Sequence, residues 1–331
     1  MDAKDLRIVF MGTPEFAVPS LRALVGGGYN VVGVVTSPDK PAGRGQKIHR
    51  SEVKIAALEL GLPVLQPEKL KAPEFVEALE ALRPDLGIVI AFRMLPEVVW
   101  AMPRLGTFNL HASLLPQYRG AAPINWAIIN GESVTGVTTM QMDEGLDTGD
   151  MIQKTEVEIT PDETGESLHD KLAAAGAALC VETLKAVETH TATFEKQGES
   201  PTAYARMLDK KLGNIDWSRS AVEIERLVRG LNSWPSAYTH WDGKVMKIWK
   251  AKAEPGAGVQ AGGTETEKFQ GESQTVAGTV VAVEKDSFTV QTGEGRLKVL
   301  QLQIPGKKRM DADAFLRGYS LKPGTVFTTE V

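Results

Sequence analysis

An asparagine, a histidine and an aspartate stand close together in one dense region of the sequence, residues 106–150. Asn109 and His111 are two positions apart at the end of a predicted strand, so their side chains should point to the same face. Asp147 follows in an acidic stretch. An asparagine amide can donate to an oxyanion, a histidine can transfer a proton, and an aspartate can orient the histidine or accept a proton itself. We therefore interpret Asn109, His111 and Asp147 as candidate catalytic residues.

The same residues also admit a purely structural interpretation. A lone histidine at a strand end is usually a hydrogen-bonded core residue, and an acidic cluster is usually a solvated turn. Here the polar pair is followed by a loop rich in glycine and proline, residues 113–123, and then by the carboxylates of residues 143–150. This combination favours a ligand-binding edge over a satisfied core.

Several other kinds of site are excluded or disfavoured. No loop ends in Gly-Lys-Ser or Gly-Lys-Thr, and Met11–Pro14 lacks the three glycines of a dinucleotide fingerprint. The five histidines show no spacing typical of metal ligands, so no metal is expected. The single cysteine, Cys180, rules out an internal disulfide and is predicted to pack in the core. The net charge of −5 means that any RNA contact must come from local basic patches.

Strand and helix patterns alternate along residues 1–200, which we predict to be a catalytic domain of the α/β class. The pattern indicates a Rossmann-like, mostly parallel sheet with helices on both faces. Ligands in such folds bind beyond the carboxyl ends of the strands, where Asn109 and His111 would lie. Strands are predicted at 6–11, 31–35, 86–91 and 107–111, and helices at 14–25, 51–60 and 73–82, with Ser51 as a possible N-cap.

The pattern changes after residue 200. Residues 201–219 are polar and are predicted to link two domains. Residues 220–331 begin with an amphipathic helix and continue as short alternating segments, which predict a smaller, OB-like β-barrel. Residues 254–274 have almost no apolar side chains and are predicted to be a flexible, disordered insertion. The helix is expected at 221–231 and the strands at 237–241, 244–249, 279–283, 287–291 and 296–301.

The motifs around the candidate catalytic residues resemble those of a known family. The stretches Asn109–Pro116, Tyr118–Pro123 and Asp147–Asp150 are similar to the core signature of formyltransferases that use 10-formyltetrahydrofolate. Nearly the whole chain takes part in the resemblance, although Ala91–Pro96 replaces a small, glycine-bearing segment and the 254–274 insertion is unusual. The stretches that resemble the members acting on methionyl initiator tRNA are Phe10–Phe16, Pro38–Gly45 and Ile215–Ser218.

The resemblance implies a reaction in which the methionyl α-amine attacks the formyl carbon and tetrahydrofolate leaves. Asn109 would stabilise the oxyanion, and His111 and Asp147 would move protons. The implied co-substrate is 10-formyltetrahydrofolate, with no metal. A pterin ring needs a flat apolar slot with backbone hydrogen bonds at its edge. The residues expected to form this pocket are Ser113, Leu114, Leu115, Pro116, Phe92, Leu95 and Asp143.

Contacts with tRNA are expected from two basic regions. The loop 37–50 contains prolines and glycines that predict a mobile segment without a helix. Within it, Arg44 lies between two glycines and could stack on a base or fork onto a phosphate. Residues 244–252, in the second domain, contain four lysines and no acid. The expected tRNA-binding residues are Arg44 and Lys47 in the loop, Lys247 in the second domain and, outside both regions, Lys210 in the linker.

Two other functions are weighed against this one. A sugar-nucleotide amine formyltransferase has a similar catalytic core, and Pro123–Trp126 would fit it. Ala121, the Pro41–Gly45 loop and the absence of a second enzymatic domain argue against that function. A non-catalytic RNA-binding protein is opposed by the intact candidate catalytic residues. No apolar run approaches the ~20 residues that span a bilayer, and no signal peptide is recognised, so we expect a cytoplasmic protein. We also expect a monomer.

Overall fold

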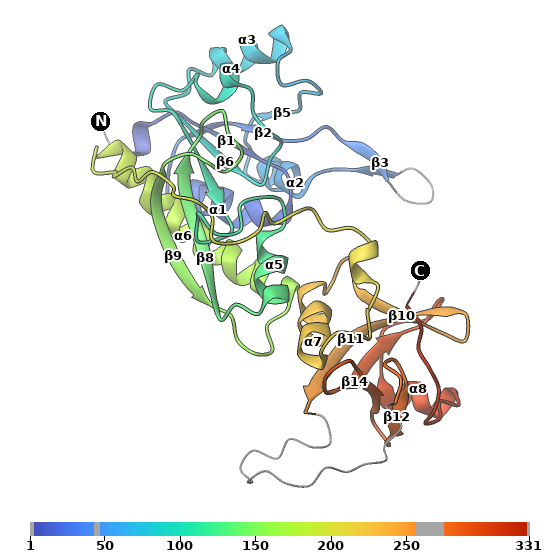
Figure 1. Cartoon of the computed structure of the whole chain (residues 1–331). Helices are drawn as coiled ribbons and strands as arrows, with labels where there is room; N and C mark the ends of the chain where they lie inside the picture. Colours follow the sequence, from blue (N-terminus) through green and yellow to red (C-terminus); the bar gives the residue numbers. More distant parts are fainter. Residues whose placement is uncertain (1–2, 43–46, 256–274, 330–331) are drawn as a thin grey trace. The chain divides into compact units, whose positions relative to one another are not determined.

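A computed structural model of the chain describes residues 3–42, 47–255 and 275–329 (Figure 1). The chain forms two compact units. Two short segments, 125–132 and 160–166, interrupt the first unit in sequence and belong to the second. The first unit comprises Met1–Ile124, Ser133–Ile159 and Ser167–Arg206, and the second comprises Asn125–Glu132, Thr160–Glu166 and Met207–Val331.

The first unit is built on one seven-stranded sheet (Figure 1). Its strands are β1 (Ile8–Gly12), β2 (Val31–Val35), β5 (Val64–Leu65), β6 (Leu86–Ile90), β7 (Thr107–His111), β8 (Val134–Gln141) and β9 (Met151–Glu158). Their order is β5-β2-β1-β6-β7-β8-β9. The first five strands in that order are parallel, while β8 pairs antiparallel with both β7 and β9. The predicted Rossmann-like, mostly parallel sheet is confirmed.

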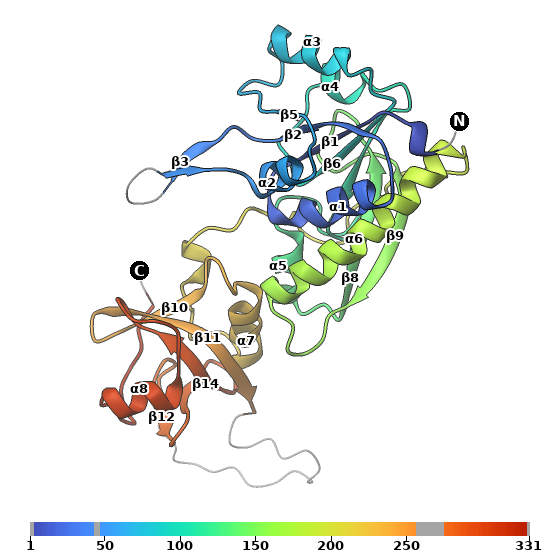
Figure 2. The same ribbon diagram turned by 180° about the vertical axis from the view of Figure 1, so that it is seen from behind.

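Helices cover both faces of this sheet. They are α1 (Val18–Gly26), α2 (Glu52–Glu59), α3 (Pro73–Ala81), α4 (Glu97–Trp100) and α6 (Gly165–Glu188). Figure 2 shows α1, α2 and α6 together on one face. Phe75 of α3 and Val99 of α4 pack with Val9, Met11 and Val89 of β1 and β6. Successive side chains of a strand point to opposite faces, so both faces of β1 are covered, and all of its residues are buried.

The structure adds elements that the sequence analysis did not predict. The helix expected at 14–25 begins as a 3-10 turn, Glu15–Ala17, before α1. The strands β8 and β9 and the long helix α6 were not predicted. In β8 the reason is that buried threonines interrupt the apolar pattern: Thr139 is fully buried and shares a 2.8 Å hydrogen bond with the equally buried Thr183 of α6. The N-cap is confirmed, since Ser51 Oγ accepts from Lys54 N at 3.1 Å.

The segment predicted as an irregular loop at 37–50 contains regular structure. Strand β3 (Lys40–Ala42) pairs antiparallel with β4 (Lys47–His49), so the described part is a short two-stranded ribbon. Backbone pairing therefore orders these six residues, and the described residues of the segment contain no helix. Residues 43–46, which include Arg44, lie outside the described residues.

The second unit contains an antiparallel barrel. Its strands are β10 (Ala237–Trp241), β11 (Lys244–Glu254), β12 (Val280–Val283), β13 (Phe288–Gln291), β14 (Arg296–Gln303) and β15 (Met310–Asp311). They are ordered β10-β11-β14-β13-β12, and β15 also pairs with β14. The C-terminal segment closes the two edges, because Thr328 bridges His240 and Val326 bridges Thr279. The predicted barrel is confirmed, while most of the predicted insertion, residues 256–274, lies outside the described part of the chain.

Two helices complete the core of the barrel. Helix α7 (Ala221–Gly230) begins with a capping box in which Ser220 and Glu223 bond each other's backbone N–H groups. Helix α8 (Ala312–Gly318) places Phe315 in a core that also holds Phe288 and Phe327. This core gives the second unit its own hydrophobic stabilisation, independent of the sheet of the first unit.

The buried cysteine leads to a testable prediction. Cys180 lies on α6, and burial raises the pKa of its thiol to about 12. The thiolate is the reactive form, so the native protein should resist iodoacetamide at about pH 8. The unfolded chain should take up one equivalent, because it has a single cysteine. Mass spectrometry before and after adding denaturant measures both states, and rapid labelling of the native protein would contradict this burial.

Candidate active site

Strand β7 places two of the candidate residues at its carboxyl end. Asn109 pairs with Val89 of β6 on one side and with Met140 of β8 on the other, so it sits inside the sheet. Its side chain is half-buried, and its amide has no hydrogen-bond partner within residues 3–42, 47–255 and 275–329. His111, two residues further along the same face, is buried at 7% exposure. The end of β7 therefore offers an uncommitted amide beside a buried imidazole.

The two nitrogens of the His111 ring face different partners. Nε2 lies 3.0 Å from the carbonyl oxygen of Tyr118. A carbonyl only accepts, so Nε2 carries a hydrogen and donates it. Nδ1 faces Oδ1 of Asp147 at 3.7 Å, and both side chains are largely buried. This separation is longer than a hydrogen bond, which leaves Nδ1 and the carboxylate free to share a proton with a reacting group.

The turn that carries Asp147 is fixed by its own hydrogen bonds. Asp147 has a positive φ of 56°, which is uncommon for a residue other than glycine. Its Oδ2 accepts from the backbone N of Gly120 at 3.0 Å. Asp143 accepts from Gly145 N at 2.9 Å and from Thr148 Oγ1 at 3.1 Å. The carboxylate of Asp143, expected at the folate, therefore builds the turn, while that of Asp147 points to His111.

The loop after β7 holds four residues expected to line the folate pocket, and their side chains differ in burial. Ser113 is fully buried and donates to Gln117 O at 2.6 Å. Leu115 is buried with Met140 and Met151 in a small cluster, so both side chains hold the loop in place. Leu114 and Pro116 are only half-buried. Of the four expected pocket residues in this loop, these two have side chains that are partly open to a ligand.

The two expected pocket residues in the loop after β6 also differ in burial. Leu95 is buried at 5% exposure in the core cluster with Val9 and Phe75, whereas Phe92 lies at the edge of that cluster. Arg93 donates to Pro67 O at 2.7 Å and to Glu68 O at 3.0 Å, and its guanidinium lies 5.3 Å from the centre of the Phe92 ring. The segment Ala91–Pro96, which differs from the family's glycine-bearing segment, therefore supplies an arginine that fixes the loop.

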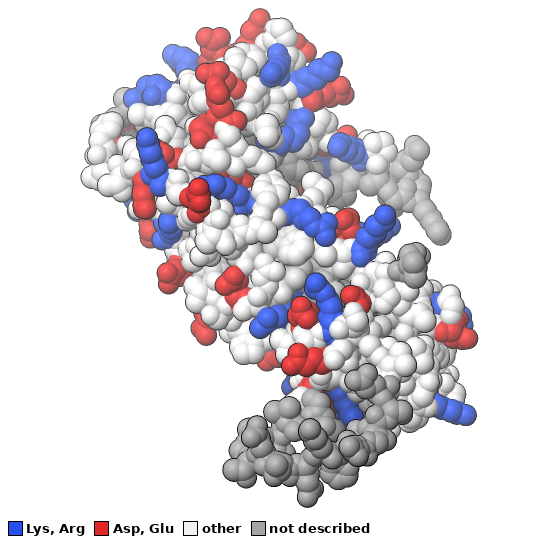
Figure 3. Space-filling view, in the orientation of Figure 1, with Lys and Arg blue, Asp and Glu red and all other residues white. Residues whose placement is uncertain are grey.

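The residues expected to bind tRNA are distributed over both units. Lys47 belongs to β4 in the first unit, while Lys210 and Lys247 belong to the second. At the base of the ribbon, Lys54 Nζ lies 2.6 Å from Asp39 Oδ2. This hydrogen bond from Lys54, with a second from Gln66, holds the pKa of the Asp39 carboxyl below its usual value. Figure 3 shows basic and acidic side chains interspersed on the face drawn, so attraction for phosphate must be local.

Sequence reasoning missed the segment that packs against the loop after Tyr118. The hydroxyl of Thr202 accepts from Tyr118 N at 2.7 Å. The backbone of Ala205 accepts from Ala121 N at 2.8 Å and donates to Arg119 O at 2.8 Å. Gln197 contacts the Asp147 turn. These residues lie in or next to the stretch expected to be a linker, and a polar stretch without periodicity carries no signal of such contacts.

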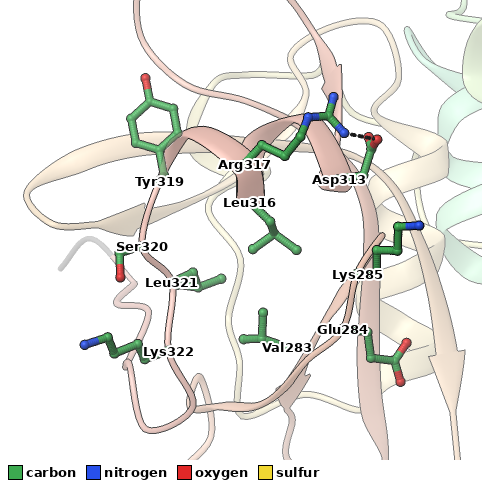
Figure 4. Close-up of a pocket in the computed structure, with 10 residues that line it drawn as sticks. All are labelled: Val283, Glu284, Lys285, Asp313, Leu316, Arg317, Tyr319, Ser320, Leu321 and Lys322. Carbon is green, nitrogen blue, oxygen red and sulfur yellow. Dashed lines mark hydrogen bonds and ion pairs between the residues drawn. The ribbon is translucent and has the colours of Figure 1, made fainter.

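Other possible sites lie elsewhere or are not found. A surface hollow of about 490 Å³ in the second unit is lined by apolar side chains such as Leu316 and Leu321, with Lys285 and Lys322 at its rim (Figure 4). None of the expected site residues lines it. Among the described residues, no group of three or more His, Cys, Asp or Glu could hold a metal ion. The described helices include none with the length and apolar character needed to cross a membrane.

Comparison with solved structures gives the same fold. A sugar 3N-formyl transferase, WlaRD, has a TM-score of 0.62 at 17% identity, covering 92% of this chain and 99% of that one. An N-formyltransferase from Helicobacter canadensis has a TM-score of 0.61 at 18% identity, covering 89% and 98%. HypX from Aquifex aeolicus, in complex with tetrahydrofolic acid, has a TM-score of 0.59 at 20% identity, covering 95% and 47%. At these identities the likeness shows the fold alone.

Comparison of sequences is more specific. Residues 6–184 match the Formyl transferase family, and residues 207–320 match the Formyl transferase C-terminal domain. The methionyl-tRNA formyltransferase of Agathobacter rectalis is 48% identical, covering 98% of this chain and 100% of that relative. The enzyme of the same name from Geobacter metallireducens is 49% identical, covering 96% and 97%. This chain therefore belongs to the formyltransferase family, and within it to the methionyl-tRNA formyltransferases.

Proposed function

We propose that this protein transfers the formyl group of 10-formyltetrahydrofolate to the α-amine of methionyl initiator tRNA. The observation that carries the proposal is the buried contact between His111 and Asp147, beside the uncommitted amide of Asn109. Family membership supports the reaction type, and the relatives' name supports the acceptor. We further propose that the enzyme acts as a monomer in the cytoplasm.

Charge changes at three atoms in the reaction: the formyl oxygen, the amine nitrogen and the folate nitrogen. The three side chains can act on these atoms. The amine nitrogen attacks the formyl carbon, and the bond from that carbon to the folate nitrogen breaks. Asn109 donates to the formyl oxygen as it becomes negative. The His111–Asp147 pair takes one proton from the attacking amine and returns one to the departing folate nitrogen, so tetrahydrofolate leaves as a neutral amine. No charge is left in the site after one turnover.

The acceptor amine separates this proposal from its nearest alternative. Sugar formyltransferases share the fold at 17–18% identity, whereas relatives named methionyl-tRNA formyltransferase reach 46–49% across nearly the whole chain. The direct test is to incubate the protein with 10-formyltetrahydrofolate and either methionyl-tRNA or an amino-sugar nucleotide. Formylmethionine should form, and formylation of the sugar alone would refute the proposal.

The catalytic assignment predicts separate losses at each residue. Replacing Asn109, His111 or Asp147 by alanine should lower kcat at least ~100-fold, as for an oxyanion donor or an acid–base group. Circular dichroism and thermal unfolding should show a retained fold, because His111 and Asp147 are held by backbone groups and do not build the hydrophobic core. Near-normal turnover by His111→Ala would remove the histidine from the mechanism.

Arg44 lies between the two strands of the ribbon, β3 and β4, in sequence. We propose that its planar guanidinium reads the acceptor end of the tRNA. Arg44→Ala should lower kcat/KM more than ~10-fold, the loss expected for one arginine that contacts a base. Arg44→Lys should not restore activity, and the preference for initiator over elongator tRNA should narrow. Full rescue by lysine with unchanged preference would reduce Arg44 to a counter-charge.

The second unit leads to a prediction about tRNA binding. Lys250 and Lys252 lie exposed on β11, where phosphates can reach them. Replacing both by glutamine should raise KM for tRNA, weaken its salt dependence and leave KM for the folate unchanged. The matched control is the same exchange at Lys285 and Lys322, on the rim of the hollow in Figure 4. Equal effects of the two pairs would show general charge attraction and no defined RNA face.

Substitution is preferable to truncation in this experiment. The second unit includes segments 125–132 and 160–166, which precede it in sequence. Asn125 Nδ2 donates to Gly230 O at 2.8 Å, and Arg229 Nη1 donates to Glu163 O at 2.9 Å. A chain cut near Asp216 would lose both partners and expose these segments, so a loss of activity would combine folding with binding.

A further inference from the structure

We infer that Gln197 is a positioning residue for Asp147, a role that rests on the proposed function. Gln197 lies after α6, in a polar stretch that no sequence motif marks. Its side chain is half-buried and reaches the two backbone turns that hold the Asp147 carboxylate. Within the described residues, its hydrogen bonds reach Arg119, Met140 Sδ and the carbonyl oxygens of Asp147 and Gly149, and none reaches a candidate catalytic side chain. Any effect on the reaction would therefore pass through the backbone that supports Asp147.

All four hydrogen-bonding positions of the Gln197 amide are used. Nε2 donates one hydrogen to Asp147 O at 2.9 Å and the other to Gly149 O at 2.8 Å. Oε1 accepts from Arg119 Nε at 2.9 Å and from Arg119 Nη2 at 2.8 Å. The opposite orientation of the amide would place its hydrogens against the guanidinium and its oxygen against two carbonyls. The position therefore requires two donors on one side and two lone pairs on the other.

These bonds fix the Asp147 carboxylate from two directions. On one side, Gln197 holds the carbonyl of Asp147 itself, whose positive φ of 56° is a conformation that needs support. On the other side, Gln197 holds Arg119, and the next residue, Gly120, donates its backbone N–H to Asp147 Oδ2. The Gln197 amide thus supports both the Asp147 backbone and the loop whose N–H binds the carboxylate. Together these contacts set the 3.7 Å distance from Asp147 Oδ1 to His111 Nδ1.

The backbone on either side of Gln197 is itself anchored. Glu195 exchanges two backbone hydrogen bonds with Met151 at the start of β9, at 2.8 and 2.9 Å. Gly198 O accepts a further bond from Arg119 Nη2 at 3.0 Å. The amide is therefore presented from a backbone segment that is itself hydrogen-bonded to the sheet edge. A misplacement of about 1 Å can cost roughly 100-fold in rate, so this support is significant for catalysis.

Two substitutions separate the donors from the acceptors. Gln197→Glu keeps the length and the two lone pairs for Arg119, but it sets an oxygen against the carbonyls of Asp147 and Gly149. Gln197→Met keeps the volume and removes both functions. Each should lower kcat by about 10-fold or more, while KM for the folate and for tRNA changes less than about 3-fold. The control is Gln153→Met, a half-buried glutamine of β9 that bonds Thr183 away from this site, and it should retain turnover.

A double-substitution cycle tests whether the effect passes through Asp147. In an Asp147→Asn background, Gln197→Glu should cost less than about 2-fold further in single-turnover rate, because the carboxylate it positions is gone. The pH profile of kcat should shift for Gln197→Glu with intact Asp147 and should not shift for Gln153→Met. Unfolding temperatures measured alongside identify any variant that loses its fold, and the remaining Gln197 variant then decides.

The outcomes are separable from the proposed function. A wild-type protein that does not formylate methionyl-tRNA would overturn the function itself. Normal formylation by both Gln197 variants would overturn the positioning role alone. Equal losses from Gln197→Glu in the presence and absence of the Asp147 carboxylate would also overturn it, since Gln197 would then act independently of Asp147.

Discussion

The contact between the His111 ring and the Asp147 carboxylate is the constraint on which the candidate site depends. A polar pair with so little exposure is stable only when its remaining atoms are hydrogen-bonded. Tyr118 O and Gly120 N supply those bonds, so the loop after β7 must return across both side chains. The positive φ values of Tyr118 and Asp147, 53° and 56°, are the local backbone strain that this course requires.

The change of strand direction at β7 supports the same loop. Strand β8 runs antiparallel to β7, so Thr138 lies directly opposite His111. The hydroxyl of Thr138 accepts from Leu115 N at 3.1 Å and donates to Ser113 O at 2.7 Å. This hydroxyl pins the start of the loop to the sheet, and Leu114 and Pro116 remain partly open. A polar group fully buried in the sheet thus positions two apolar side chains beside the candidate catalytic residues.

The division into two units does not follow the order of the chain. Segments 125–132 and 160–166, which flank β8 and β9 in sequence, have their partners in α7 and the residues after it. The barrel has its own aromatic core and a closed ladder of strands, so its exposed lysines can be replaced with little effect on folding. The exposed lysines of the barrel can therefore be changed while the hydrogen bonds at the end of β7 are left intact.

The sequence by itself determined what depends on local periodicity. Alternation fixes Asn109 and His111 on one face of a strand end, Ser51 caps its own helix, and short alternating segments predict the barrel. Only the tertiary structure decided that Leu95 and Leu115 fill core clusters, that Asp143 builds a turn, and that Gln197 supports Asp147. The reason is physical: a side chain's period sets the face on which it lies, whereas its partner is the distant segment that packs into the same volume.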